Sequence, residues 1–397
     1  MHKHYISLIS LIILISLSVL FIPGENNHPS RKVKSVSIGT DSLITISISV
    51  VGDIMCHSVQ YTYARVNADS FNFAPVFTEV KKFLDSSDFL FGNLETVTAG
   101  EKKGYSGYPL FNSPDAFIAA LKTAGFNLLT TANNHALDRG EAGVRRTIEQ
   151  LTLNHLNYNG TYLSEEDKDS LRIFNIKGIK IAFLAYTYGT NGNPVPKGKE
   201  YLINIIDTTK IRNDINFARG RGVDLVLVHF HFGEEYQHSP SIYQKEIVKK
   251  IVEDGADIII GGHTHVLQPI DIFKTNKTKL DMGFVIYSMG NFISNQRWRY
   301  SDGGAILTFS ITKDSRNDAL WLKNIEYLPI WVFKGMTHSG RKYIILPSQT
   351  AFNDSLYTFL TRTERKLEEQ SFYDAKEILT KYSQKPHLKE VIPDNYK

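Results

Sequence analysis

The chain has 397 residues, of which 42% are hydrophobic, so it can bury one large α/β core with an extension or two modest domains. Its 45 basic and 41 acidic residues give a formal net charge of +4, and no basic tract interleaved with aromatic residues is present. Nucleic acid is therefore excluded as an expected partner. The single cysteine, Cys56, cannot form an intrachain disulfide, which excludes a disulfide-stapled fold.

The amino terminus predicts a membrane anchor. Lys3 and His4 precede an apolar run over 6–22 that only serines interrupt, and Pro23 and Gly24 follow it. At ~1.5 Å per residue this run reaches about 25 Å, the lower limit for a bilayer span. No small-residue cleavage site follows, which favours an uncleaved signal anchor over 1–24 rather than a removed signal peptide.

A buried core helix is a third interpretation of this run, and its position at the extreme terminus disfavours it. The polar residues that follow predict a linker over 25–43. Both export interpretations place the body of the protein outside the cytoplasm. We therefore expect a cell-membrane location with an extracytoplasmic domain.

Five short apolar runs predict strands, and a polar cluster follows each of them. Near-continuous apolar runs separated by helical stretches indicate a buried sheet with much parallel character. The carboxyl ends of such strands gather at one edge, where ligands bind, so the five clusters predict one site. The runs and their clusters are 44–51 with Gly52 and Asp53, 89–91 with Asn93 and Glu95, 128–131 with Asn134 and His135, 225–228 with His229 and His231, and 258–260 with His263 and His265.

Helical spacing of apolar residues predicts helices between the strands. Pro114 and Gly125 mark the start and end of the second helix. Beyond Asn291 the pattern predicts strands over 305–311 and 321–327 and charge-rich helical stretches over 355–385. The helices expected before Asn291 are 75–84, 115–124, 141–153, 208–218 and 240–253.

The polar clusters supply the donors of a hydrolytic metal site. A site with two cations ~3.5 to 4 Å apart needs carboxylate, imidazole and amide-oxygen ligands from several strands. Nitrogen and oxygen donors without thiolate suit Mn, Zn or Fe. His135 would then be free to donate a proton to a leaving group, with Asp138 as the second candidate catalytic residue. The six candidate ligands are Asp53, Glu95, Asn134, His231, His263 and His265.

Each residue also has an ordinary structural interpretation. Asp53 is compatible with a turn after a strand, and Asp138 with a helix cap. His229 and His231 project to the same face of one strand, and we interpret His229 as a hydrogen-bonded scaffold residue because His231 is nearer the strand end. Only the ordered set of clusters favours a metal site.

Six motifs in order resemble the CapA, or PgsA, family, which is linked to bacterial capsule and poly-γ-glutamate synthesis and belongs to the calcineurin-like metallophosphoesterase superfamily. The resemblance covers roughly 47–311. It implies an α/β fold in the form of a four-layer αββα sandwich, which we place over 44–312, and an amino-terminal membrane anchor. Separately, we expect a carboxy-terminal α+β extension over 313–397, packed on this domain. The motifs are Gly52-Asp53-Ile54-Met55, Asn93-Leu94-Glu95, Ala132-Asn133-Asn134-His135, His231-Phe232-Gly233-Glu234-Glu235-Tyr236, Gly262-His263-Thr264-His265 and Tyr287-Ser288-Met289-Gly290-Asn291-Phe292.

Carried over by position, the resemblance makes His135 the general acid, Asp53 the first metal ligand and Asn134 the amide ligand. It makes His231, His263 and His265 the imidazole ligands. Two positions depart from the superfamily, which has histidine where this chain has Met55 and a bridging aspartate where it has Asn93. Glu95 is the alternative bridging carboxylate and His57 the alternative imidazole. The number of divalent ions, one or two, stays open. The possible ligands or supporting residues are His57, Asn93 and His229.

Loop residues near these motifs are candidates for substrate binding, although each is equally compatible with an ordinary loop role. An arginine can hold a phosphate or carboxylate in a fork geometry. The candidates are Arg139, Glu235, Tyr236 and Asn291.

Two functions are compatible with the sequence. The first is a membrane-anchored, metal-dependent hydrolase acting on a phosphoester or an anionic envelope polymer. The second is a non-catalytic metal-binding component of a polymer synthesis and export complex, with a polymer ligase or export subunits as partners.

Overall fold

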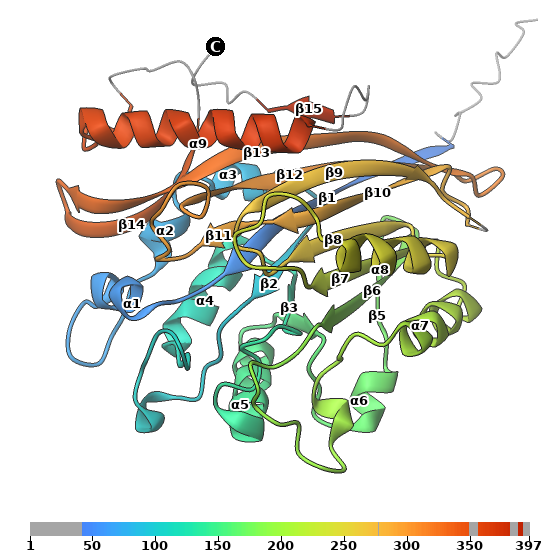
Figure 1. Ribbon diagram of the computed structural model, residues 1–397, viewed down its shortest axis with the longest axis horizontal. Helices are drawn as coiled ribbons and strands as arrows, with labels where there is room; N and C mark the ends of the chain where they lie inside the picture. Colours follow the sequence, from blue (N-terminus) through green and yellow to red (C-terminus); the bar gives the residue numbers. More distant parts are fainter. Residues whose placement is uncertain (1–41, 277, 349–355, 382–387, 392–397) are drawn as a thin grey trace, which may run out of the picture. The chain divides into compact units, whose positions relative to one another are not determined.

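The computed structural model describes residues 42–276, 278–348, 356–381 and 388–391 (Figure 1). These belong to one compact unit, Asp41–Lys397. The signal anchor expected at 1–24, and all but the last two residues of the linker expected at 25–43, lie outside the described residues. Within the described ranges, no helix is long and apolar enough to cross a membrane.

The larger of two mixed sheets has nine strands in the order β14-β13-β12-β1-β2-β3-β4, with β11 on β1 and β15 on β13. Strand β1 pairs in parallel with β2 and antiparallel with β12. The strands are β1 Leu43–Ile54, β2 Phe89–Leu94, β3 Leu128–Thr130, β4 Asn157–Asn159, β11 Asn291–Ile293, β12 Gly303–Asp314, β13 Leu320–Thr337, β14 Gly340–Pro347 and β15 Leu388–Glu390.

The second sheet has six strands in the order β5-β6-β7-β8-β10-β9. Its central strands β6, β7, β8 and β10 pair in parallel, and the outer strands β5 and β9 are antiparallel to their neighbours. The strands are β5 Arg172–Ile176, β6 Ile179–Thr187, β7 Leu225–His231, β8 Ile258–Gly262, β9 Leu267–Lys274 and β10 Met282–Met289.

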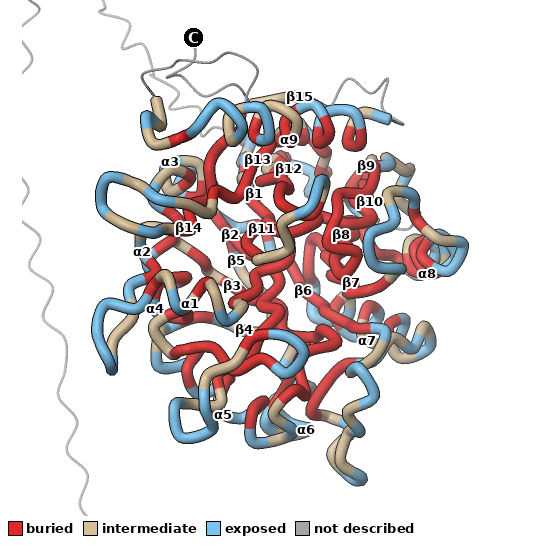
Figure 2. Tube along the Cα trace, turned by 60° about the vertical axis from the view of Figure 1, so that its left-hand side comes forward, coloured by how far each residue is buried: buried red, intermediate tan, exposed pale blue. Residues whose placement is uncertain are grey.

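Most helices cover the outer faces of the two sheets, whereas the last one, Arg362–Thr380, reaches the core between them. The strands are buried along most of their length, whereas buried and exposed residues alternate along the outer helices (Figure 2). The helices are α1 Ser58–Ala64, α2 Ala74–Phe77, α3 Lys81–Leu84, α4 Asp115–Ala124, α5 Gly140–Leu153, α6 Glu165–Asp169, α7 Thr208–Gly220, α8 Ile242–Glu253 and α9 Arg362–Thr380, with short 3-10 turns at Glu101–Lys103 and Glu200–Leu202.

Three buried apolar clusters establish the order of the layers. Val50 of β1 packs in a cluster with Phe183 of β6, between the two sheets. Successive side chains of a strand point to opposite faces, so the adjacent Val51 packs instead with Phe117 of α4. On the far side of the six-stranded sheet, Ile251 of α8 packs with strands β6, β7 and β8. The unit is therefore an α/β fold with layers in the order helix, sheet, sheet, helix.

The expectation that all five runs share one sheet is wrong. Strands β1, β2 and β3 belong to the nine-stranded sheet, whereas β7 and β8 belong to the six-stranded sheet. An apolar run identifies a buried strand but not its hydrogen-bonding neighbour, because pairing is decided by contacts distant in sequence. The polar clusters still converge, because the two sheets face each other across a shared core.

The helix expected over 75–84 is two short helices, α2 and α3. The break lets Val76, Phe77, Val80 and Leu84 all enter the same cluster beneath the nine-stranded sheet. The second expected helix is confirmed as α4, which ends at Gly125 with φ +108°, in the left-handed region that glycine tolerates best.

The carboxy-terminal residues complete the core. Strands β13 and β14 extend the nine-stranded sheet beyond β12. Helix α9 packs on β13, β9 and β12, and its Ala375, Ile378 and Leu379 join the cluster between the sheets. The domain boundary expected at 312 and 313 stays a prediction.

Candidate metal centre

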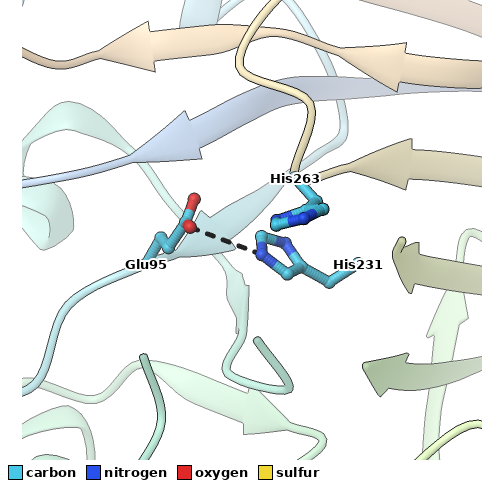
Figure 3. A group of neighbouring side chains, drawn as sticks. All are labelled: Glu95, His231 and His263. Atoms are coloured by element: carbon cyan, nitrogen blue, oxygen red, sulfur yellow. Dashed lines mark ion pairs between the residues drawn. The ribbon is translucent and has the colours of Figure 1, made fainter. Parts of the chain in front are cut away.

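The ends of five strands from the two sheets place the candidate ligands in one buried cluster. Asp53 is the penultimate residue of β1 and lies beside Asn93 of β2, with which it is paired in register. Glu95 follows β2, and in Figure 3 its carboxylate faces the rings of His231 and His263. His231 ends β7 in register with Gly262 of β8. All six candidate ligands are at most 4% exposed.

Two groups of donor atoms overlap at Glu95. In one group Glu95 lies with His231 and His263, and in the other it lies with Asp53 and His265. The donor atoms in each group lie within 4.8 Å of one another. The single carboxylate of Glu95 therefore faces the partners in both groups. The sequence had made Glu95 the alternative candidate for a bridging carboxylate.

Asp53 is surrounded by hydrogen-bond donors. Its Oδ1 accepts a hydrogen bond from Asn93 Nδ2 at 2.8 Å, and its Oδ2 accepts one from the backbone N–H of His263 at 3.2 Å. His265 Nδ1 lies 3.2 Å from Oδ2. Burial by itself would raise the pKa of Asp53, but its contacts with His265 and His231 outweigh burial and lower this pKa. Asp53 is therefore ionised.

Glu95 has the opposite environment. Neither of its buried carboxylate oxygens makes a hydrogen bond within the described part of the chain, and His231 Nε2 is 3.3 Å from Oε1. Burial, with the nearby charge of Asp53, raises the pKa of Glu95 well above its usual value. A buried carboxylate without hydrogen bonds is costly unless a cation compensates it.

His263 and His265 lie on a strained turn. Their φ angles are +92° and +59°, in a region that residues with a side chain rarely occupy. Gly262 precedes them because a Cβ there would lie 2.8 Å from Asp53 Oδ1. Strain of this kind persists where the surrounding contacts over-determine it, and it is concentrated at functional sites.

The imidazoles differ in protonation. Burial lowers the pKa of His231 to about 3 and that of His263 well below its usual value, so both are neutral and able to act as ligands. Burial also opposes the charge on His265, but Glu95 and Asp53 outweigh it and raise the pKa of His265 to about 9. His265 is thus the imidazole that pairs with the carboxylates, 3.2 Å from Asp53 Oδ2 and 3.9 Å from Glu95 Oε1.

These residues fit a divalent cation. The cluster contains orphaned acceptor atoms on Glu95 and on His263 Nδ1, together with neutral imidazoles and an ionised aspartate. A cation supplies the charge and the bonds that Glu95 and His263 lack. The donors are nitrogen and oxygen only, unlike those of a structural thiolate zinc site.

Amide side chains hold the ligands in place. Asn134 Oδ1 lies 2.8 Å from His231 Nε2, which brings the expected amide ligand to the cluster. Asn93 Nδ2 lies 3.1 Å from His231 Nδ1, so Asn93 joins His231 to Asp53. His229 is buried two residues earlier, and burial lowers its pKa to about 3. Its Nδ1 has no hydrogen-bond partner among the described residues.

His135 and Asp138 form a dyad beside the cluster. His135 Nδ1 lies 2.8 Å from Asp138 Oδ2, and both side chains are at most 3% exposed. The backbone N–H of Phe111 donates to the same Asp138 oxygen at 2.8 Å, and the Phe111 ring packs edge-on against His135. The dyad leaves His135 Nε2 as the nitrogen available for proton transfer.

Three other predicted residues make hydrogen bonds around the cluster. His57 Nδ1 lies 3.1 Å from Gln60 Oε1, and neither donor group includes His57. Arg139 donates to the carbonyls of Phe111 and Leu110 rather than standing free. Asn291 is fully buried, and its Oδ1 lies 3.1 Å from His265 Nδ1.

Glu235 and Tyr236 lie on the exposed side of the cluster. Tyr236 has φ +63°, and its ring centroid lies 6.0 Å from that of His265.

Sequence reasoning missed Tyr188 and the supporting role of Asn133. Tyr188 follows β6, a strand that was not predicted, and its ring centroid lies 4.5 Å from that of His263. Asn133 donates to Asn93 Oδ1 at 3.1 Å and to the Leu94 carbonyl at 2.8 Å. The apolar run Ile179–Thr187 was the signal that could have found Tyr188, because it has the same strand-then-polar pattern as the others.

Comparison with known proteins identifies the family. Residues 47–296, more than half of the chain, match the family model described as bacterial capsule synthesis protein PGA_cap. The chain belongs to this family. The match confirms the resemblance found in the motifs, and all six candidate ligands lie within the matched residues.

Two curated relatives are biosynthesis proteins named CapA. The capsule biosynthesis protein CapA of Bacillus anthracis is 30% identical over 274 residues, which are 67% of this chain and 64% of that protein. The PGA biosynthesis protein CapA of Bacillus subtilis strain 168 is 28% identical over 316 residues, 76% of this chain and 77% of that protein. The chain thus spans about two thirds to three quarters of these relatives.

Solved structures show partial similarity. The NAD nucleotidase NadN of Haemophilus influenzae aligns with a TM-score of 0.46 at 14% identity, covering 89% of this chain and 58% of that chain. The calcineurin-like phosphoesterase YfkN of Bacillus subtilis aligns with a TM-score of 0.40 at 13% identity, covering 83% of this chain and 99% of that chain.

Proposed function

We propose that this protein is a metal-dependent hydrolase of capsule or other envelope-polymer synthesis, acting on a phosphoester or on another bond of an anionic polymer. The observation that carries the proposal is the buried, unpaired carboxylate of Glu95 facing neutral imidazoles. Family membership supports the link to capsule synthesis.

The residues that would hold the divalent metal are Asp53, Glu95, Asn134, His231, His263 and His265. When bound, a cation at this position polarises a substrate oxygen and makes water a nucleophile near neutral pH. Asn93 and Asn291 hold Asp53 and His265 in orientation, as supporting hydrogen bonds do at metal sites.

His135 is the proposed proton donor. Asp138 fixes its ring through Nδ1, and the Phe111 amide and ring hold the pair from the other side. His135 Nε2 then passes its proton to the oxygen of the leaving group as the bond to it breaks. Burial of the dyad excludes bulk water from this transfer.

The test combines metal content with hydrolysis of a chromogenic phosphoester by the purified protein. We expect wild-type protein to retain a divalent ion after dialysis, and His263→Ala to lose it. His135→Ala should keep the ion and lose activity by roughly 10²- to 10⁴-fold, the usual contribution of a general acid. Metal-free wild-type protein after reconstitution would falsify the proposal.

Met55 favours a second candidate function, a non-catalytic metal-stabilised component of a synthesis and export complex. Met55 is 1% exposed, and its sulfur accepts a hydrogen bond from Ser294 Oγ at 3.6 Å, so it occupies the imidazole position without offering an imidazole. Under this function, His135→Ala leaves polymer output intact. Loss of output in a normally folded His135→Ala protein decides for the hydrolase.

We also propose that residues 1–24 anchor the protein in the cell membrane with the described unit outside the cytoplasm, where a polymer ligase or export subunits would be partners. The apolar run over 6–22 supports this. Deleting 1–24 should release the protein from the membrane fraction and stop polymer output. Unchanged membrane association of the deletion variant would contradict the anchor.

A further inference from the structure

Four exposed aromatic residues surround the buried histidines. We call Tyr108, Tyr188, Tyr236 and Trp298 the aromatic rim. Their exposed fractions are 72%, 40%, 37% and 50%, whereas His135, His263 and His265 are at most 4% exposed. The histidines therefore lie beneath the rim, and a ligand that approaches them from solvent meets these rings.

Each tyrosine of the aromatic rim contacts a different histidine. The ring centroids are 6.2 Å apart for Tyr108 and His135, 4.5 Å for Tyr188 and His263, and 6.0 Å for Tyr236 and His265. Trp298 stands at 5.2 Å and 70° to Tyr236. The rim thus spans both the proton donor and the metal ligands.

Hydrogen bonds hold the rim loops in place. The Tyr236 N–H donates to the Thr264 carbonyl at 2.8 Å, between the two histidine ligands, and its hydroxyl accepts from Gln296 at 3.1 Å. Asn191 Oδ1 accepts from Asn134 at 3.1 Å and from the Tyr188 hydroxyl at 3.4 Å. The rings are therefore placed before any ligand arrives, which reduces the ordering cost of binding.

The charge around the rim does not suit a polyanion. Glu235 is exposed and acts electrostatically on both Tyr188 and Tyr236. Arg139, the cation expected to bind substrate, turns its guanidinium toward the carbonyls of Leu110 and Phe111. Arg299, beside Trp298, is likewise bound to both carboxylate oxygens of Asp374, so the exposed charge next to the rim tyrosines is the carboxylate of Glu235.

From the rings and this charge, we infer that the aromatic rim binds an uncharged sugar ring of the substrate, next to the bond held at the metal centre. A sugar offers C–H groups to the faces of tyrosine and tryptophan, and hydroxyls to Glu235 and the tyrosine hydroxyls. This inference rests on the proposed function and narrows its substrate to a phosphoester attached to a neutral carbohydrate.

The geometry favours a sugar over a nucleobase. A flat base stacks best between parallel rings or on one open plane. The rim instead presents Tyr236 and Trp298 at 70° to each other, with Tyr108 and Tyr188 over different histidines. A puckered ring with C–H groups pointing in several directions contacts such a set, whereas a flat base contacts only one member.

The test is calorimetric titration of the full chain in detergent with neutral tetrasaccharides, namely an α-glucan, a β-glucan and a β-linked N-acetylglucosamine oligomer. Adenosine and a γ-linked glutamate oligomer are the competing probes. We expect at least one tetrasaccharide to bind, and Trp298→Ala and Tyr236→Ala each to weaken that binding by tenfold or more. Phe217→Ala, an aromatic on α7 that is 45% exposed, is the matched control and should leave binding unchanged.

Three outcomes overturn the inference: no tetrasaccharide binds, adenosine or the glutamate oligomer binds more tightly, or the rim variants bind like wild type while keeping its melting temperature. His263→Ala, the variant expected to lose the metal ion, separates this inference from the proposed function. If the wild-type protein binds a tetrasaccharide but retains no metal and shows no hydrolysis, the result supports the rim and rejects the hydrolase. Metal-dependent hydrolysis of the chromogenic phosphoester by a wild-type protein that binds none of the tetrasaccharides rejects the rim and leaves the hydrolase standing.

Discussion

At the scale of single residues, Glu95 explains most about the site. Its carboxylate is fully buried, makes no hydrogen bond within the described residues, and faces His231 at 3.3 Å. Asp53 nearby already receives the donors of Asn93 and the His263 backbone. The fold thus supplies hydrogen bonds to Asp53 and leaves Glu95 for a cation. We therefore expect Glu95→Gln to have opposite effects on metal binding and on the stability of the metal-free protein.

Glu95→Gln should reduce metal content by at least tenfold, because the amide removes the charge that both donor groups share. The same change should stabilise the metal-free protein by about 1–3 kcal/mol, because burial disfavours the ionised carboxylate that Glu95 carries in the unfolded state at neutral pH, whereas glutamine is uncharged in both states. Metal analysis and urea unfolding after chelation measure the two effects. Glu235→Gln, at an exposed carboxylate, is the control and should change neither. Equal metal content in Glu95→Gln and wild type would contradict the ligand assignment.

Gly262→Ala tests the close approach of β8 to Asp53. The added Cβ would lie 2.8 Å from Asp53 Oδ1, so Asp53 must move away from the ligand cluster. We expect loss of the bound metal and a stability decrease of roughly 1–3 kcal/mol. Gly220→Ala is the matched control, because its Cβ would meet nothing within 4 Å. Full metal content in Gly262→Ala would show that Asp53 is not a ligand.

At the scale of secondary-structure elements, α9 is a helix with two buried acidic residues, Asp374, which is paired with Arg299, and Glu368. The helix begins at a capping box in which the Thr361 side chain and Glu364 satisfy each other's backbone N–H groups. Its apolar face enters the core between the sheets through Leu379, which is fully buried. Glu368 is 4% exposed on the same helix, and burial raises its pKa to about 7, against the opposing charge of Arg365.

Glu368 makes stability depend on pH. Its folded pKa is raised, so the folded state binds the proton more tightly than the unfolded state, and its contribution is most favourable below the unfolded pKa of 4.5. Stability falls as the pH rises from there through about 7. Glu368→Gln should therefore raise the free energy of unfolding by roughly 1–3 kcal/mol at pH 8 and change it little at pH 4.

Urea unfolding at the two pH values measures the effect of Glu368→Gln. The control is Glu377→Gln at an exposed position of α9, which should show no such pH-dependent gain. The same gain at pH 4 and pH 8 would show that titration of Glu368 is not its cause.

At the scale of the whole described unit, the candidate ligands join the two sheets. Asp53, Glu95 and Asn134 come from the ends of strands in the nine-stranded sheet, and His231 with the turn after β8 comes from the six-stranded sheet. Below the site the sheets meet mainly through an apolar cluster, which is non-directional, with a few hydrogen bonds such as that from Asn159 Nδ2 to the Phe183 carbonyl at 2.6 Å. Coordination of a bound ion would therefore link the two sheets directionally, in addition to their apolar packing.

Metal binding should raise the thermal stability of the whole unit. At a metal concentration about 100-fold above Kd, ligand linkage contributes about 2.7 kcal/mol to the folded state. We expect the melting temperature to rise by several degrees with Mn²⁺ or Zn²⁺ and to fall again on chelation, as measured by scanning calorimetry. His231→Ala should lose this response, and an equal response in that variant would place the ion elsewhere.

Much of the site could be predicted because its signals are local. An apolar run followed by Asp53, or by the histidines after Ile260, marks a strand end and a donor within a few residues. Gly125 likewise predicted the end of α4 from its own preference for positive φ. By contrast, Tyr188 was missed because its strand was missed, and the commitment of Arg139 to backbone carbonyls depends on a loop nearly thirty residues away in sequence.

The sequence by itself determined which residue types stand at the strand ends, and hence nitrogen and oxygen donors without thiolate and membership of a capsule-protein family. Only the tertiary structure decided that these strand ends come from two sheets, that Glu95 faces both donor groups, and that aromatic rings cover the histidines. The physical reason is the range of the interactions involved. Donor chemistry and strand propensity belong to a residue and its neighbours, whereas sheet partners, burial and charge balance arise between segments that meet only when the chain folds.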